Sequence, residues 1–175
     1  MSKRHMKEHG ILFSPPMVQA ILRGAKTVTR RLEAPAARPG DVLWVREAWA
    51  FADAATEAWR TTPVADVVYS STAEVPEGWR RRHARFMPKR YARIWLLVDD
   101  VREEPLHAID DADARLEGIA SGPWASPRDG FARLWDSING DVAPWATNPR
   151  VFRIAFRRVD APARPDTTDD ERTDR

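Results

Sequence analysis

The chain has no cysteine among its 175 residues. Without thiols it cannot form disulfide bonds, thiolate zinc sites, iron–sulfur clusters or a cysteine nucleophile. Long apolar runs are also missing. The best uncharged run, Gly10 to Leu22, contains two prolines and is shorter than the roughly 20 residues that a membrane helix needs. Because no small-residue cleavage site follows this run, we expect a cytoplasmic protein without a membrane segment.

Several catalytic and nucleotide-binding motifs are absent as well. The sequence has no Walker-type phosphate loop, dinucleotide fingerprint, nucleophile elbow or paired Asp/Glu motif. Of the four histidines, His5 and His9 have helical ligand spacing but lie in the polar N-terminus, and His83 and His107 have no evident partners. We therefore expect neither a metal nor another cofactor.

Charge is unevenly placed along the chain. The formal net charge is only +2, but the segment from Asp160 to Arg175 carries six acids and three bases. The first 159 residues therefore have 25 basic and 20 acidic side chains. We expect a flexible N-terminus over 1–9, one domain over 10–159 with an insertion at about 50–87, and a disordered acidic tail over 160–175. A mildly basic domain suits a polyanionic partner, although solubility explains the same balance.

Apolar spacing and capping residues predict three helices. Ser14 and Pro15 form a suitable N-cap and first helical residue. Asp110 can cap a second helix that runs to Glu117. A third helix before Gly140 carries an apolar stripe formed by Phe131, Leu134, Trp135 and Ile138.

Strand patterns occur between and after these helices, over 27–32, 42–49, 64–69, 91–101 and 151–159. The order lacks the regular alternation of strand and helix that predicts a parallel doubly wound sheet. We expect an α+β fold, a small and mostly antiparallel β-barrel with helices packed on it.

The densest polar cluster follows the first helix, in the segment from Gly24 to Arg31. Its bases and hydroxyls beside a glycine turn can hold an anion or polarise a carbonyl. Lys26 and Thr29 would face opposite ways in a regular strand, so they share a pocket only if Lys26 still belongs to the turn. An edge strand with protective charges is the alternative interpretation.

Glu117 lies in the last turn of its predicted helix, where the helix dipole disfavours a carboxylate. A nearby lysine or arginine would compensate it, and a Lys–Glu pair in a cleft is suited to proton transfer. A solvated glutamate is the alternative.

The strand over 42–49 places Glu47 and Trp49 on one face. An aromatic ring beside a hydrogen-bonding carboxylate can grip a base, so both residues are candidate substrate contacts. With eight tryptophans in the chain, core packing is the competing role for Trp49.

A basic run with no acid extends from Gly78 to Val98, interleaved with aromatic residues. It is the best candidate for contacts with nucleic-acid phosphates, and a solvated basic loop is the alternative. The proposed nucleic-acid-binding residues are Arg80, Arg81, Arg82, Arg85, Lys89 and Arg90.

These segments resemble the ASCH domains of the PUA-like superfamily, small β-barrels associated with RNA and modified nucleosides. The family signature Gly-x-Lys-x-x-Glu-x-Arg is matched by Gly24, Lys26 and Arg31, with Thr29 where glutamate is commoner. The segments PGDVLWVREAW, MPKRYARIWL, LEGI and FARLWDSING are similar to the long phage and prophage forms.

With threonine at this position, the sequence resembles the small bacterial ASCH enzymes that hydrolyse the acetyl amide of acetylcytidine. The resemblance implies that Lys26 is the activating base, Thr29 the nucleophile or participating hydroxyl, and Glu117 the proton-handling carboxylate. Arg31 is a suitable oxyanion donor. We expect a monomer that acts as an amidohydrolase on a modified cytidine or related nucleoside. A noncatalytic reader of RNA or modified bases and a metal-independent ribonuclease are the alternatives.

Overall fold

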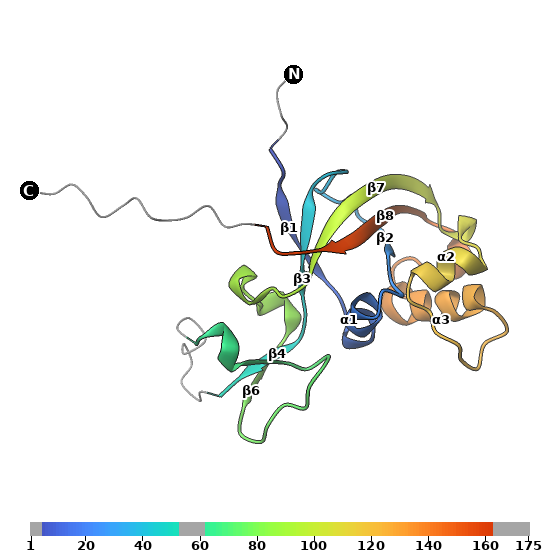
Figure 1. Cartoon of the computed structure of the whole chain (residues 1–175). Coiled ribbons are helices and arrows are strands. Elements are labelled where there is room, and N and C mark those ends of the chain that lie inside the picture. The colour runs from blue at the N-terminus through green and yellow to red at the C-terminus, as the bar shows by residue number, and fades with distance from the viewer. Residues whose placement is uncertain (1–4, 53–61, 163–175) are drawn as a thin grey trace, which may run out of the picture.

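The computed structural model describes residues 5–52 and 62–162. Its main sheet has five strands in the order β1-β3-β7-β8-β2 (Figure 1). These strands are β1 (Glu8–Leu12), β2 (Val28–Arg31), β3 (Val42–Arg46), β7 (Trp95–Pro105) and β8 (Arg150–Val159). The pairing of β1 with β3 is parallel, and the other three pairings are antiparallel.

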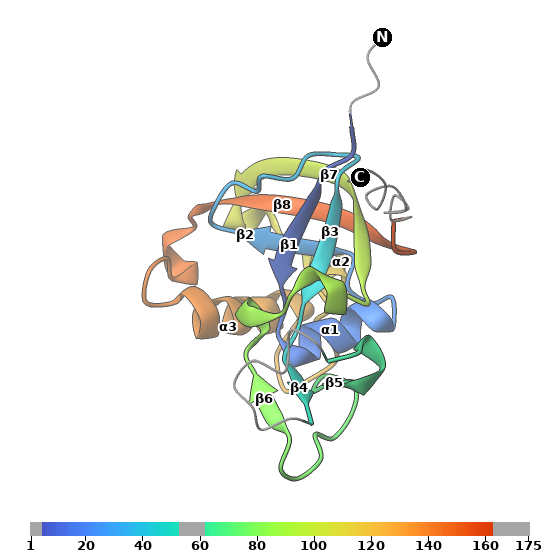
Figure 2. The ribbon, with the colours of Figure 1, turned by 90° about the vertical axis from the view of Figure 1, so that its left-hand side faces the viewer.

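The expected α+β class is confirmed, whereas the expected closed barrel is not. In the described part of the chain β1 and β2 remain at opposite ends of the strand order, so no ladder closes the sheet. The sheet is nevertheless strongly curved, and β1 and β3 cross in front of β8 and β2 in Figure 2. The Arg31 guanidinium donates to the Leu12 carbonyl at 2.7 Å, so a side chain joins the ends of the two edge strands.

A second sheet has three short strands in the order β5-β4-β6: β4 (Trp49–Phe51), β5 (Val67–Tyr69) and β6 (Arg80–Arg82). The single strand expected over 42–49 is therefore wrong, because β3 ends at Arg46 and Trp49 begins β4. The amide of Glu47 points to the Met87 sulfur at 3.4 Å instead of a strand carbonyl, and the ladder breaks there.

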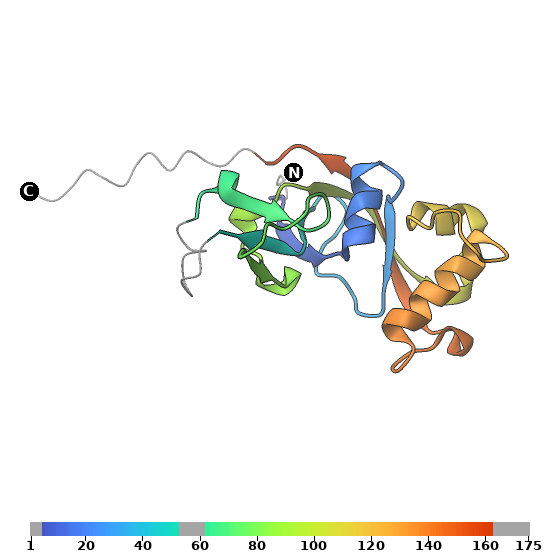
Figure 3. The same ribbon diagram turned by 90° about the horizontal axis from the view of Figure 1, so that it is seen from below.

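The three helices agree closely with the sequence. Helix α1 spans Pro15–Leu22, α2 spans Asp111–Leu116 with the Asp110 carboxylate on the Asp113 amide, and α3 spans Pro127–Asn139. The three-stranded sheet and the α2–α3 pair lie at opposite ends of the molecule, with α1 between them (Figure 3).

The apolar core lies inside the curve of the main sheet, where α1 covers it through Val18 and Ile21. A smaller cluster around Trp49 belongs to the three-stranded sheet, and a third fixes α3 against α2. Strand β1 begins at Glu8, so Glu8 and His9, assigned above to the flexible terminus, pair with β3. The tail beyond 162 lies outside the described residues.

Candidate active site

The turn after α1 places Lys26 before the edge strand β2 begins. Gly24 adopts φ of +75°, a conformation that glycine takes without penalty. The amides of Ala25 and Lys26 both donate to the Ala20 carbonyl, at 2.9 and 3.1 Å. Lys26 then forms an isolated antiparallel bridge with Glu117. Lys26 therefore belongs to the turn, which is the condition set above for Lys26 and Thr29 to face one pocket.

The Lys26 ammonium makes a buried ion pair with Glu117, 91 residues later. Nζ lies 2.8 Å from Oε2 of Glu117, and also donates to the carbonyls of Glu117 at 2.9 Å and Val28 at 2.8 Å. The side chains of Lys26 and Glu117 are only 3% and 4% exposed. The place of Glu117 at the end of α2 left two alternatives, a nearby lysine or arginine and a solvated glutamate, and the structure shows the first.

A second cation, Arg30, holds the other oxygen of the Glu117 carboxylate. Its Nη1 donates to Oε1 of Glu117 at 3.1 Å, and its remaining nitrogens bind Glu104 and Asp113. Arg153 donates to Asp113 at 2.8 Å from the neighbouring strand β8. Sequence reasoning assigned no role to Arg30. Its only signal was its place in the basic turn, since no spacing rule pairs it with acids on α2 and β7.

Burial shifts the proton affinities of this network. Burial lowers the pKa of Lys26, and the adjacent Glu117 opposes that shift only in part. Burial also lowers the pKa of Arg30, but the hydrogen bond to Asp113 and the charge of Glu117 outweigh it and raise the pKa overall. Hydrogen bonds from Arg153 and Arg30 overcome burial and lower the pKa of Asp113 to about 2. The network thus keeps Arg30 charged and brings Lys26 closer to deprotonation.

A cavity of about 500 Å³ opens onto this ion pair. Lys26, Thr29 and Glu117 all line it, together with Arg31. Its volume falls within the roughly 300–1,000 Å³ range of small-molecule sites. Its apolar wall includes Phe13 of the turn before α1, and Phe131, Leu134 and Trp135 of α3. The structure therefore brings the three proposed catalytic residues together at one concave surface.

Two polar side chains that line this cavity have unused hydrogen-bonding groups. Thr29 is 4% exposed, and its hydroxyl makes no hydrogen bond to the residues that the structure describes. Arg31 lies over the Phe13 ring at 5.3 Å, and burial lowers its pKa. The Arg31 Nε has no hydrogen-bond partner within residues 5–52 and 62–162. Thr29 and Arg31 therefore line the cavity with hydrogen-bonding groups that the described residues leave unused, and the Arg31 Nε among them is buried.

Glu47 and Trp49, the proposed substrate contacts, lie outside the lining of this cavity. The Glu47 carboxylate is 1% exposed and receives two bonds from Arg93, at 2.8 and 2.9 Å, and one from Ser71. The Trp49 ring is equally buried and contacts Phe51 at 5.4 Å between ring centroids. These contacts hold the three-stranded sheet together.

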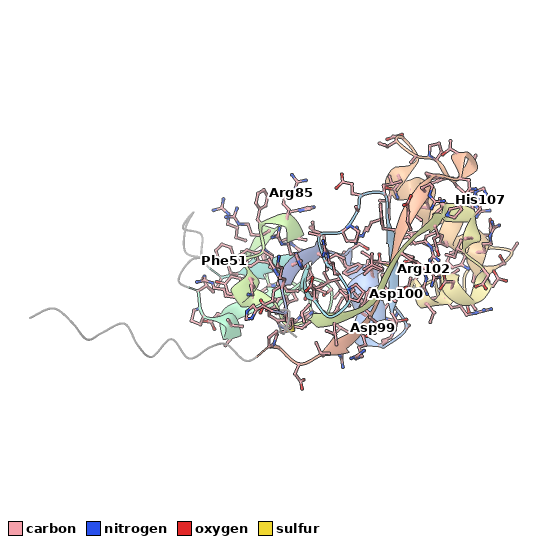
Figure 4. The ribbon with its side chains drawn as sticks, turned by 90° about the horizontal axis from the view of Figure 1, so that it is seen from above. Phe51, Arg85, Asp99, Asp100, Arg102 and His107 are labelled. Atoms are coloured by element: carbon pink, nitrogen blue, oxygen red, sulfur yellow. The ribbon has the colours of Figure 1, made fainter. Side chains whose placement is uncertain are left out.

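The proposed nucleic-acid-binding residues belong to β6 and to the two short 3-10 helices after it, Ala84–Phe86 and Lys89–Tyr91. Lys89 pairs with Glu8, whereas Arg81, Arg82 and Arg85 have no carboxylate partner among the described residues. Arg85 projects outward from this end of the molecule (Figure 4). Three cations are therefore available for phosphate contacts.

The expected insertion contributes directly to the cavity wall. His83 and Ala84 of this insertion line the same cavity as Lys26 and Glu117, and so does Ala48 just before it. Sequence reasoning found no partner for His83. Only the folding of β6 against β4 brings it to this position.

Neither metal binding nor membrane spanning is supported in the described part of the chain. Within residues 5–52 and 62–162, no group of three or more histidines and carboxylates could hold a metal ion. Every helix in those ranges is too short or too polar to cross a bilayer.

No protein-family model matches the sequence, and no curated protein matches it. The structure is similar to the ASCH domain of Lactobacillus crispatus JV V101, with 11% identity, a TM-score of 0.49, and coverage of 89% of this chain and 81% of that one. Protein EF3133 of Enterococcus faecalis V583, from the DUF984 family, gives 11% identity and a TM-score of 0.48 over 90% and 83% of the chains. A point variant of the Zymomonas mobilis ASCH protein gives 12% identity and a TM-score of 0.44 over 88% and 76%. The chain is thus similar to ASCH-domain proteins over about nine-tenths of its length, at low sequence identity.

Proposed function

We propose that the protein is a hydrolase that removes an acyl group from a modified cytidine or a related nucleoside. The observation that carries this proposal is the buried Lys26–Glu117 pair, which lines one cavity with the unbonded Thr29 hydroxyl. A hydroxyl becomes a nucleophile when a neighbouring base takes its proton. Burial that lowers the pKa of Lys26 shifts this lysine toward that role.

In the first step Lys26 transfers a proton to Glu117, whose Oε2 lies 2.8 Å away. The neutral amine then accepts the proton of the Thr29 hydroxyl while Oγ1 attacks the acyl carbon. Negative charge develops on the acyl oxygen, and the guanidinium of Arg31, which lines the cavity, is the proposed donor. Arg30 remains bound to Glu117 throughout and fixes the carboxylate in place.

In the second step the C–N bond breaks, and the ammonium of Lys26 returns its proton to the leaving amine of the base. The acyl group is now an ester of Thr29. A water molecule attacks this ester while the neutral Lys26 amine takes its proton and passes it to the departing Thr29 oxygen. The carboxylic acid is released, and Glu117 returns its proton to Lys26. One water is consumed, and the net products are the free nucleoside and acetate.

Variants at Thr29 test this mechanism because two substitutions separate shape from chemistry. Thr29→Val keeps the shape without the hydroxyl, and Thr29→Ser keeps the hydroxyl. With acetylcytidine as substrate, we expect Thr29→Val to lower kcat by at least about 1,000-fold, as for loss of a nucleophile. Thr29→Ser should retain measurable turnover. Equal rates for wild type and Thr29→Val would refute the mechanism.

A noncatalytic reader of RNA or modified bases is the second candidate. It is favoured by the three exposed or half-buried cations Arg81, Arg82 and Arg85, and by the hydrogen bonds that engage all three protons of the Lys26 ammonium. Binding through three phosphates predicts that log K for a single strand falls with log salt at a slope of about −2. A titration with single-stranded RNA that stays flat between low and high salt would exclude this candidate.

A further inference from the structure

The catalytic steps above leave one polar residue of the cavity unused. His83 follows β6 and is the N-cap of the 3-10 helix Ala84–Phe86. It lines the cavity with Ala48 and Ala84, and it is the one polar side chain that the described residues of 47–52 and 62–93 contribute to the lining. The three-stranded sheet therefore delivers an imidazole to the surface on which Lys26 lies.

Local hydrogen bonding fixes the tautomer of His83. Its Nδ1 accepts from the backbone N–H of Arg85 at 3.1 Å. A nitrogen that accepts cannot carry the ring proton of a neutral imidazole, so that proton is on Nε2. Nε2 makes no hydrogen bond to any residue that the structure describes, and the His83 side chain is exposed. His83 is thus an oriented donor without a protein acceptor.

The surroundings of His83 favour a negatively charged ligand group. Among the described residues that line the cavity, Glu117 is the one carboxylate, and both of its oxygens are bound, by Lys26 and Arg30. Arg82 and Arg85 flank His83 in the chain and have no carboxylate partner in the described ranges. The Nε of Arg82 is buried without an acceptor there. A phosphate supplies several acceptor oxygens and the compensating charge.

We propose that His83 binds a phosphate of the substrate through Nε2–H, so that the cavity selects a phosphorylated nucleotide over the free nucleoside. The proposal rests on the proposed function for the identity of the base. Ala48 and Ala84 present small side chains to this wall, and Arg82 and Arg85 flank His83 in the chain outside the cavity lining. The phosphate belongs either to a mononucleotide or to a polynucleotide, and the experiment separates these two sources.

Calorimetric binding of cytidine, cytidine 5′-monophosphate and a cytidine trinucleotide tests this proposal without requiring turnover. Wild type should bind the monophosphate at least tenfold more tightly than cytidine. His83→Asn keeps an acceptor for the Arg85 amide but removes Nε2, and should bring the two affinities close to each other. His83→Gln can still reach with an amide donor and should retain most of the preference.

His5→Asn is the matched control, because His5 does not line the cavity and its substitution should leave the preference unchanged. Tighter binding of the trinucleotide than of the monophosphate, lost in His83→Asn, assigns the phosphate to a polynucleotide. Equal affinity of wild type for cytidine and its monophosphate, absence of binding by both, or an unchanged preference in His83→Asn would overturn the proposal.

Failure of the hydrolase proposal gives a different result. A His83-dependent preference for the monophosphate without any acyl release would leave the phosphate subsite in place and remove the catalytic role. Acyl release with an unchanged KM for the phosphorylated substrate in His83→Asn would support the catalytic role and remove the phosphate subsite. If both the hydrolase proposal and the phosphate subsite are correct, His83→Asn should raise KM at least fivefold for acetylcytidine monophosphate and leave kcat within twofold.

Discussion

Removing either partner of the Lys26–Glu117 pair should destabilise the protein, and removing both should cost much less than the sum. The substitutions are Lys26→Met, which keeps an apolar stem, and Glu117→Gln, which keeps the shape of the carboxylate. Both side chains are almost fully buried, at 3% and 4% exposure. Each single substitution therefore leaves an uncompensated polar or charged group in the interior, which typically costs about 3–5 kcal/mol.

The remaining contacts place the expected loss at the lower end of that range. In Glu117→Gln, the Lys26 ammonium keeps the carbonyls of Val28 and residue 117. Arg30 likewise keeps Glu104 and Asp113. We expect each single variant to lose about 3 kcal/mol of unfolding free energy, and the double variant about 4 kcal/mol, which is a coupling of about 2 kcal/mol.

Urea unfolding at pH 7, followed by tryptophan fluorescence, measures all four proteins of this cycle. The slopes with urea should agree among the variants, so that the midpoints report stability. Additive losses, with a coupling below about 0.5 kcal/mol, would refute the account of Lys26 and Glu117 as one buried unit.

Three further predictions concern the surroundings of the pair. Gly118 has φ of +90°, and an added Cβ would lie 2.9 Å from the Ala20 Cβ and 3.2 Å from the Lys26 Cβ. Gly118→Ala should therefore lower the free energy of unfolding in urea by about 2 kcal/mol. A loss under about 0.5 kcal/mol would contradict this prediction. Because the pKa of Asp113 is lowered to about 2, its stabilisation is present above pH 3.8 and is lost as the pH falls toward 2; Asp113→Asn should be less stable than wild type by about 2 kcal/mol at pH 6, and the two should converge near pH 2. Because burial lowers the pKa of Lys26, the unfolded chain keeps the proton of this lysine up to a higher pH than the folded protein does. Wild type should therefore gain stability relative to Lys26→Met as the pH rises toward 10.5. A decline in relative stability over that range would be inconsistent with the burial of Lys26.

Local signals explain how much of the fold could be predicted from the sequence. The Asp110 cap and the apolar stripe of α3 depend on residues a few positions apart, and the three helices occur where they were predicted. Ser14 occupies the N-cap position of α1 without a side-chain hydrogen bond. The position of Lys26 in the turn followed from Gly24 for the same reason.

The errors in the fold prediction come from long-range pairing. The segment 42–49 contains no glycine, proline or other turn residue that would mark a break, but the Glu47 carboxylate binds Arg93 and the chain leaves the main sheet at that residue. Barrel closure depends on whether β1 and β2 meet across the curve of the sheet. No pattern within either strand contains that information.

In the candidate site, too, local signals were predictable from the sequence and long-range contacts were not. A cation beside Glu117 was predictable, because a carboxylate at a helix C-terminus needs compensation. The identity of Arg30, and its sharing among three acids, depends on the approach of α2 and β7 to β2. His83 reaches the cavity through the pairing of β6 with β4, which its neighbours in sequence do not indicate.

The most direct test of the central claim is a chromatographic assay of acetylcytidine incubated with wild-type protein and with Lys26→Met. The account predicts that wild type releases cytidine and acetate in equal amounts, and that Lys26→Met, folded by circular dichroism, slows this release at least about 100-fold through loss of the base. The absence of free cytidine with wild type, or equal release by both proteins, would contradict the assignment of Lys26, Thr29 and Glu117 to acyl hydrolysis.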